Sequence, residues 1–188
     1  APALRVDQIG LDAPPSVAPQ REGPTNVSKP IEISGNGISI IGHIERTGDV
    51  VASDGQQLGQ EGSNLRLEGF QVMWPDKPDG LDLTYGLTLE GGESIPMVSV
   101  GQFCGTRNQA RRITEVTFAL VGANAHQYQL DGVAHFSGGF QTPVMSGLTL
   151  SGPSGLEHLT SISLRAVAAV NAPPRKPNLW NDSPRTQV

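Results

Sequence analysis

The histidines and the single cysteine are the first residues to consider for chemistry. The histidines are His43, His126, His135 and His158. They stand far apart, and none has a partner four residues away, the spacing that places two zinc ligands on one helix face. We therefore interpret them as surface or strand histidines and expect no metal and no other cofactor. Cys104 lies between Phe103 and Gly105 without a neighbouring base, which predicts a small buried apolar side chain.

Two pairs of aspartates are candidates for acid–base or metal chemistry. Asp49 and Asp54 lie close together in a glycine-rich stretch, where aspartate is also favoured for hydrogen bonds to its own backbone in turns. Asp76 and Asp79 lack the further acidic positions of a calcium loop. The sequence contains no nucleophile elbow, His-Glu-x-x-His motif, phosphate-binding loop or dinucleotide fingerprint. We therefore interpret both pairs as turn residues and predict that the chain is not an enzyme.

Carbohydrate binding makes smaller demands on a sequence. It needs a rigid turn with a carboxylate or amide that holds vicinal hydroxyls, and an aromatic face for the C–H side of the sugar. We expect turn loops after Gly48, Gly92 and Gly138 to supply these groups. The candidate carbohydrate-binding residues are Asp49, Asp54, Glu93, Phe140 and Gln141.

The composition excludes several other classes of protein. The 188 residues include 13 basic and 18 acidic side chains, for a net charge of −5, so the positive charge that dominates nucleic-acid affinity is missing. A single cysteine cannot form a disulfide within the chain. We expect no membrane span and no intact signal peptide, because no long apolar run or basic, then apolar, beginning is present.

The elements that must position the candidate residues are β-strands. Alternation of apolar and polar residues predicts strands over 38–44, 65–74, 81–90, 116–120 and 162–166. The apolar parity switches at Gly69, which predicts a bulge, and the prolines of 75–80 predict a turn. A helix over 156–170 is the competing interpretation of the last strand.

Glycines recur at a spacing of 44 to 47 residues and mark three units, at about 38–80, 81–126 and 127–170. The four columns are Gly42, Gly86 and Gly132; Gly48, Gly92 and Gly138; Gly55, Gly101 and Gly147; and Gly59, Gly105 and Gly152. A strand-rich unit with one apolar face is not stable alone, so the three must bury these faces against one another. This predicts an all-β, threefold pseudo-symmetric β-prism-like domain, with a β-sandwich as the alternative.

Residues 43–74 resemble the clostridial hydrophobic repeat family that is named for its tryptophan. The matching residues are Gly48, Asp54, Gly55, Gly59, Gly62, Leu65, Arg66, Leu67 and Glu68. Just after Gly48, where the family has tryptophans, the chain has Asp49, Val50 and Val51. Such repeats occur on bacterial surface proteins and are associated with carbohydrate or protein binding, so the resemblance implies an adhesive module.

Proline-rich segments flank the three units. We predict extended arms over 1–36 and 171–188 around a β domain at 37–170, with Leu179 and Trp180 as anchors on a partner subunit. The sequence thus predicts a non-enzymatic, extracellular module that reads bacterial envelope polysaccharide. The arms would hold it as an oligomer in a cell-surface or phage-like assembly. The alternative is a purely structural spike, decoration or fibre subunit of a virion-like particle.

Overall fold

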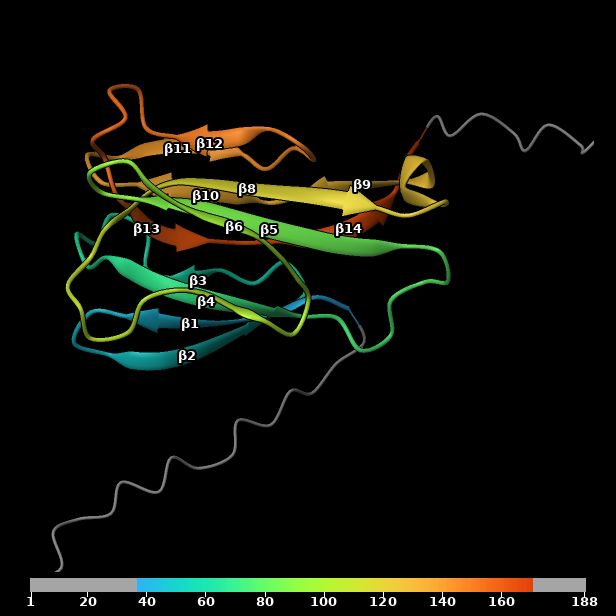
Figure 1. Ribbon diagram of the computed structural model, residues 1–188, viewed down its shortest axis with the longest axis horizontal. Helices are drawn as coiled ribbons and strands as arrows, with labels where there is room; N and C mark the ends of the chain where they lie inside the picture. The colour runs from blue at the N-terminus through green and yellow to red at the C-terminus, as the bar shows by residue number, and fades with distance from the viewer. Residues whose placement is uncertain (1–36, 171–188) are drawn as a thin grey trace, which may run out of the picture. The chain divides into compact units, whose positions relative to one another are not determined.

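The computed structural model describes residues 37–170, so both predicted arms, with Leu179 and Trp180, lie outside the described residues. This part of the chain is all-β and built from antiparallel sheets (Figure 1). Its one helical turn is a short 3₁₀ segment at Ala125–Gln127. The all-β prediction is confirmed. The competing helix over 156–170 is wrong, because that stretch forms β13 (Leu159–Ile162) and β14 (Arg165–Ala168).

Each predicted unit contributes two hairpin strands, a short strand and a closing strand. The first unit holds β1 (Ser39–Ile44), β2 (Gly48–Ser53), β3 (Leu58–Gly59) and β4 (Leu67–Met73). The second holds β5 (Asp82–Leu89), β6 (Glu93–Ser99), β7 (Phe103–Gly105) and β8 (Ile113–Val121). The third holds β10 (Val133–Phe136), β11 (Phe140–Pro143), β12 (Thr149–Ser151) and β13, while β9 (Tyr128–Asp131) pairs with β14.

Every four-stranded sheet takes its short edge strand from the next unit. The sheets have the orders β2-β1-β4-β7, β6-β5-β8-β12 and β11-β10-β13-β3. In each, the hairpin and the closing strand come from one unit, and the short strand comes from the following one. The first unit supplies β3 to the third unit's sheet, so the exchange runs in a cycle and no sheet is complete without a neighbouring unit.

One glycine in each unit makes the same hydrogen bond to the neighbour. The backbone N–H groups of Gly55, Gly101 and Gly147 donate to the carbonyls of Leu164, Val72 and Phe118 at 3.1, 2.7 and 2.7 Å. These glycines have φ of +80°, +86° and +80°, in the left-handed region that favours glycine. Donors and acceptors both recur every 46 residues, so this glycine column was predicted correctly.

The buried side chains follow the same spacing. Leu67, Ile113 and Leu159 are fully buried. The residues three positions further along the closing strands, Phe70, Val116 and Ile162, are fully buried as well. These residues from three sheets belong to one hydrophobic core. Burying one such side chain contributes about 1.5–3 kcal/mol, so the shared core is what makes three one-sided units stable together.

The other glycine columns were aligned wrongly. The hairpins close between Ile44 and Gly48, between Leu89 and Glu93, and between Phe136 and Phe140, so their spacing is 45 and 47 residues rather than 44 and 46. The residues equivalent to Gly42 are therefore Leu87 and Ala134. Gly48, Gly92 and Gly138 are not equivalent to one another. In the last column the equivalent residue is Ser151, and Gly152 lies one residue beyond it. The reason is physical: Gly91, Gly92, Gly138 and Gly139 all have positive φ, so a three-residue turn accepts glycine at neighbouring positions.

The local predictions on the closing strands have mixed outcomes. The bulge at Gly69 is confirmed, because the partners of β1 jump from Gly69 to Leu67 between His43 and Ile44. The turn at 75–80 is also confirmed. The single strand over 162–166 is wrong: β13 ends at Ile162, and β14 begins at Arg165 in another sheet. After β13 the Leu164 carbonyl accepts the hydrogen bond from Gly55.

We expect Gly101→Ala to lower the free energy of unfolding by about 1–2 kcal/mol, the cost of an L residue in the left-handed region. No atom lies within 4 Å of the position that its Cβ would take, so the cost is one of backbone conformation alone. Gly101→Asn is the matched control and should lose less, because asparagine adopts this conformation more readily. Urea unfolding followed by tryptophan fluorescence, to which buried Trp74 contributes, measures both, and equal losses would contradict the prediction.

Candidate functional site

The outward faces of the three sheets present chemically different side chains at equivalent positions. One row of cross-strand neighbours runs over each face. In the first sheet it is Asp49, His43, Gly69 and Gly105. In the second it is Ser94, Thr88, Glu115 and Ser151. In the third it is Gln141, His135, Ser161 and Gly59. The three rows occupy equivalent positions on the three sheets, and they differ in how far the neighbouring unit covers them.

Loop 106–112 closes the row on the first face. His43 is only 8% exposed; its Nδ1 lies 2.7 Å from Asp49 Oδ1 and its Nε2 3.1 Å from Asn108 Oδ1. The Arg107 guanidinium stacks 3.6 Å above the Phe103 ring and lies 3.4 Å from the Asp49 carboxylate. Every charged group of this cluster therefore has a partner within the protein.

The His43–Asp49 pair is not arranged as a catalytic pair. The ring nitrogen that would activate a nucleophile in a Ser-His-Asp triad faces the Asn108 amide instead of a hydroxyl. Partial burial on its own would raise the pKa of Asp49, but the hydrogen bonds from His43 and Arg107 outweigh it and hold this pKa below its usual value. The arrangement therefore fixes loop 106–112 on the sheet.

Residues of the first unit cover part of the row on the third face, where His135 stays half-buried and Gln141 exposed. Ser161 is fully buried, and Gln57 Nε2 donates a hydrogen bond of 2.8 Å to its Oγ. His158 Nε2 lies 3.1 Å from the Asn64 carbonyl. A hollow of about 240 Å³ beside this contact is lined by the apolar residues Ile44, Val50 and Leu65 together with polar residues that include Gln57 and Thr160.

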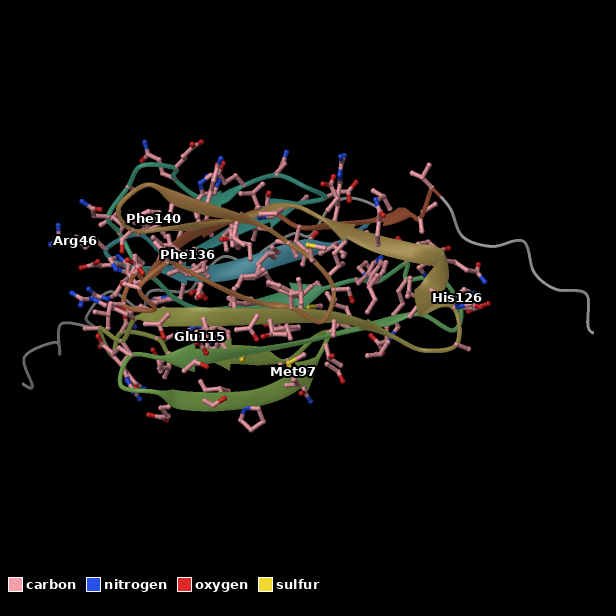
Figure 2. The ribbon with its side chains drawn as sticks, turned by 90° about the horizontal axis from the view of Figure 1, so that it is seen from above. Arg46, Met97, Glu115, His126, Phe136 and Phe140 are labelled. Carbon is pink, nitrogen blue, oxygen red and sulfur yellow. The ribbon has the colours of Figure 1, made fainter. Side chains whose placement is uncertain are left out.

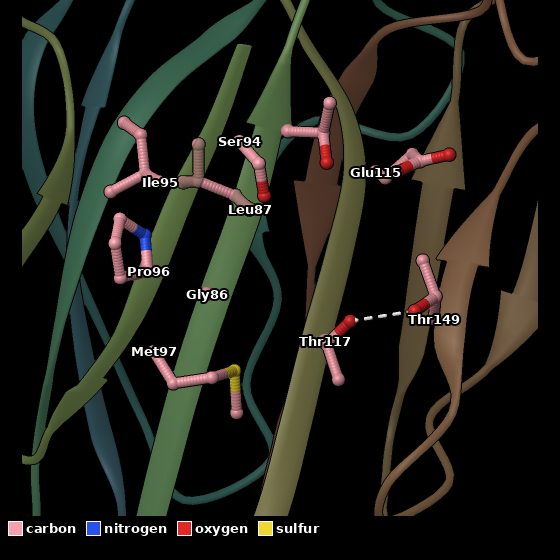
Figure 3. A pocket seen from close by; sticks show the side chains of 10 residues that line it. Gly86, Leu87, Ser94, Ile95, Pro96, Met97, Glu115, Thr117 and Thr149 are labelled. Carbon is pink, nitrogen blue, oxygen red and sulfur yellow. Dashed lines mark hydrogen bonds between the residues drawn. The ribbon is translucent and has the colours of Figure 1, made fainter. Parts of the chain in front are cut away.

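The second face is open and carries a trough along β5 and β8 (Figure 3). The trough has a volume of about 300 Å³. Thr88 and Glu115 face it from the row described above, and Gly86, Thr117 and Thr149 form the next row across the sheet. The Oγ1 atoms of Thr117 and Thr149 lie 2.9 Å apart. One side of this face is therefore a platform of hydroxyls and one carboxylate.

The opposite wall of the trough is apolar and comes from a bulge in β6. The partners of β5 jump from Val98 to Ile95, so Pro96 and Met97 stand out from the ladder. Met97 is 45% exposed and leans over Gly86, where an added Cβ would lie 2.9 Å from its sulfur. A glycine at position 86 thus leaves room for the methionine wall. Figure 2 shows Met97 and Glu115 on the same side of the molecule.

A second hollow of about 520 Å³ continues the trough beyond Thr88 and Glu115. It is lined by Glu90, Arg112 and the 80% exposed Leu156. Loop 152–158 corresponds to the covering loop of the first face, but its hydrogen bonds are internal. Ser154 Oγ donates a hydrogen bond of 2.7 Å to one carboxylate oxygen of Glu157, and the Ser154 N–H donates one of 3.1 Å to the other oxygen. Because this loop satisfies its own polar groups, it leaves the row on the second face uncovered.

Glu115 is the central charged group of the trough. None of the ion pairs found within residues 37–170 includes it. Its cross-strand neighbours Thr88 and Ser151 carry hydroxyls. A carboxylate with no internal cation accepts hydrogen bonds from solvent or from a ligand, which makes Glu115 the group best placed to hold one.

The structure does not bring the predicted carbohydrate-binding residues together. The expected loops are wrong: the residues after Gly48 and Gly92 begin strands β2 and β6, and those at 140–141 begin β11, each in a different sheet. Asp49 lies in the closed cluster, and Glu93 is paired with Arg111 at 2.5 Å. Asp54 lies past the far end of β2, because the chain between the two aspartates is extended rather than turned.

Phe140 and Gln141 lie on the third sheet, away from the trough. Phe140 is 43% exposed and lies at the same end of the molecule as Arg46, opposite His126 (Figure 2). The trough residues Thr88, Glu115, Thr117 and Thr149 were not predicted. The signal for part of them was present, because the polar positions of the alternating strand at 81–90 are the outward ones.

Cys104 is buried, as predicted, and is 1% exposed. Burial raises the pKa of its thiol to about 11. Within residues 37–170 no three His, Cys, Asp or Glu side chains are grouped so that they could hold a metal ion. The same residues contain no helix with the length and apolar character that crossing a membrane requires.

Neither a protein-family model, nor a curated protein, nor a solved structure matches this chain. The resemblance of residues 43–74 to the clostridial repeat family therefore stays a prediction that rests on the quoted residues. The trough has to be interpreted from its own chemistry.

We expect Cys104 to react with a thiol reagent such as DTNB only after unfolding. With a pKa of about 11 the thiol stays protonated at about pH 8, and the thiolate is the reactive form. The absorbance of released thionitrobenzoate, with and without urea, measures this. Rapid labelling of the folded protein would contradict it.

We expect Asp49→Asn to destabilise the protein near neutral pH but to have little effect in acid. The folded-state pKa of Asp49 is lowered, so its stabilising effect is present above the unfolded pKa of about 3.9 and is lost as pH falls through the folded value. Urea unfolding of both proteins at about pH 6 and about pH 3 measures this. A difference that persists or grows in acid would show that the charged carboxylate is not responsible.

Proposed function

We propose that residues 37–170 form a non-enzymatic carbohydrate-recognition module, whose three sheets pack as the sides of a β-prism and whose ligand lies in the trough on β5 and β8. The observation that carries the proposal is the open polar row, with Glu115 and the threonine hydroxyls facing an apolar wall. The equivalent row on the first face is covered by a loop of the neighbouring unit, and the row on the third face is covered at Ser161.

The two walls of the trough suit the two sides of a sugar ring. A carboxylate such as Glu115 accepts hydrogen bonds from two neighbouring sugar hydroxyls, and threonine hydroxyls both donate and accept. Pro96 and Met97 offer an apolar surface to the C–H side of the ring. This is the combination that the sequence led us to expect, with a methionine and a proline in place of an aromatic ring.

The length of the trough favours a polysaccharide over a single terminal sugar. The hollows of about 300 and 520 Å³ share Thr88 and Glu115, so they form one continuous surface with Glu115 in the middle. Small ligands usually occupy one enclosed cavity. An open surface of this kind accommodates several residues of an extended chain, as bacterial envelope polysaccharides provide.

Binding without cleavage is supported by the carboxylates of the trough. Glycosidases of the common type need two carboxyl groups on either side of the scissile bond. Glu115 is one carboxylate, and the next, Glu90, has the Arg112 guanidinium 3.9 Å away. The predicted partner subunits and the location on a surface or phage-like particle rest on the arms, which lie outside the described residues, and they stay proposals.

The binding groups stand on strands, which supports rigid presentation to the ligand. Thr88, Glu115 and Thr117 lie in the two central strands of a four-stranded sheet. Groups that are already fixed lose little conformational entropy on binding. We therefore infer that the trough needs no rearrangement to receive a glycan.

We expect Glu115→Gln to weaken glycan binding by about tenfold or more, because a hydrogen bond to a charged group contributes about 1.5–3 kcal/mol. Thr117→Val should also weaken it. Glu61→Gln removes the same charge from an exposed position in another loop and should bind like the unchanged protein.

A microbial glycan array identifies the glycan, and calorimetry with that glycan compares the three variants. Absence of binding to any glycan by the folded full-length chain would overturn the proposed function. Unchanged affinity of Glu115→Gln would overturn the assignment of the site.

A further inference from the structure

The second strand of each hairpin forms an edge of its sheet, and the three edges are protected differently. These edge strands are β2, β6 and β11. β6 carries Pro96 within its bulge, and β11 carries Pro143. Proline and bulges are the usual devices that prevent an exposed edge from pairing with another chain. In β2 the corresponding residue is Val51, because Val51 faces Ile41 as Pro143 faces Val133.

The β2 edge is regular along its whole length. All six of its residues pair with β1 without a shift of register, and it contains no proline. It is therefore the one hairpin edge among residues 37–170 that has the geometry of a pairing surface and neither of the two protections.

Three observations fix which backbone groups of β2 point outward. The N–H of Asp54 donates to the carbonyl of Ile38, across the hairpin. Because backbone groups alternate in direction along a strand, the N–H groups of the odd-numbered residues of β2 point away from β1. The N–H of Ser53 donates to the Gln56 side chain. Pro143, at the position equivalent to Val51, keeps its register without any N–H. The N–H groups of Asp49 and Val51 therefore face outward from the sheet edge.

The side chains of β2 suit pairing with a second copy of the same strand. Val51 and its neighbour Ile41 are only half-buried on the outward face, so a second Val51 placed opposite would cover both. The only charged residue of the strand is Asp49, which His43 and Arg107 already neutralise. When Val51 faces Val51, Asp49 faces Ser53 of the other copy, so no like charges meet. The outward N–H and C=O of Ser53 are already bonded to Gln56, so the backbone hydrogen bonds between the copies are those of the central Val51 pair.

We propose that two copies of this chain associate through antiparallel pairing of their β2 strands about a twofold axis at Val51. A twofold axis makes the contact self-complementary and closes the assembly at two copies. The pairing joins the two β2-β1-β4-β7 sheets into one continuous sheet. It leaves the trough on β5 and β8 accessible in both copies, so it does not depend on the proposed glycan binding.

Sedimentation velocity of the full chain from micromolar to near-millimolar concentration tests the proposal. Val51→Pro introduces the residue that stands at the equivalent place in β11, so the hairpin should still form. Val51→Thr keeps the N–H and the β-branched shape and is the matched control. We expect a dimer for the unchanged protein and for Val51→Thr, and a monomer for Val51→Pro with an unchanged far-UV circular dichroism spectrum.

A monomer at every concentration would overturn the proposal, and so would a Val51→Pro variant that sediments like the unchanged protein. Cross-linking tests the register separately. Hydrogen-bonded antiparallel pairs have Cα atoms about 5.5 Å apart, within disulfide range, so Val51→Cys should form a covalent dimer on mild oxidation. Ser94→Cys, on the β6 edge, should not. Failure of Val51→Cys to cross-link in a sample that dimerises would overturn the Val51 register.

Discussion

The short strand that each unit gives to the sheet of its neighbour is the interaction on which the rest of the structure depends. β7 completes the first sheet, β12 the second and β3 the third, and the hydrogen bonds from Gly55, Gly101 and Gly147 run alongside. Because each unit is both donor and acceptor, removing one opens an edge in another sheet and exposes part of the shared core. The three units are therefore stable only as a set, although each contains its own hairpin and closing strand.

This exchange also determines which outward faces are available. The residues that follow each short strand continue over the neighbouring face, so the loop of one unit covers or spares the surface of another. Loop 106–112 covers the first face through Asn108 and Arg107. In loop 152–158, by contrast, Ser154 and Glu157 form a hydrogen bond to each other. Small sequence differences in these loops thus decide the accessibility of a face without changing the core.

Much of the fold was predictable from the sequence, because it follows from short-range patterns. The alternation at 81–90 gave β5, and the glycine column at 55, 101 and 147 marked the contact that repeats. The column at 42, 86 and 132 misled because Gly86 serves another purpose: it leaves space for Met97. Glycine spacing alone does not distinguish a glycine needed for φ from one needed for room.

The site was not predictable for a different reason. Glu115 and Thr149 lie 34 residues apart in the sequence, in strands of different units, and they face the same trough only because β12 pairs with β8. Asp49 was a candidate because it is a carboxylate near glycines. In the structure His43 and Arg107, which come from two different units, both form hydrogen bonds to it. Whether a carboxylate is free to bind a ligand depends on which cations the exchange of strands brings beside it. In the proposed site, Glu115 is such a carboxylate, because none of the ion pairs found within residues 37–170 includes it.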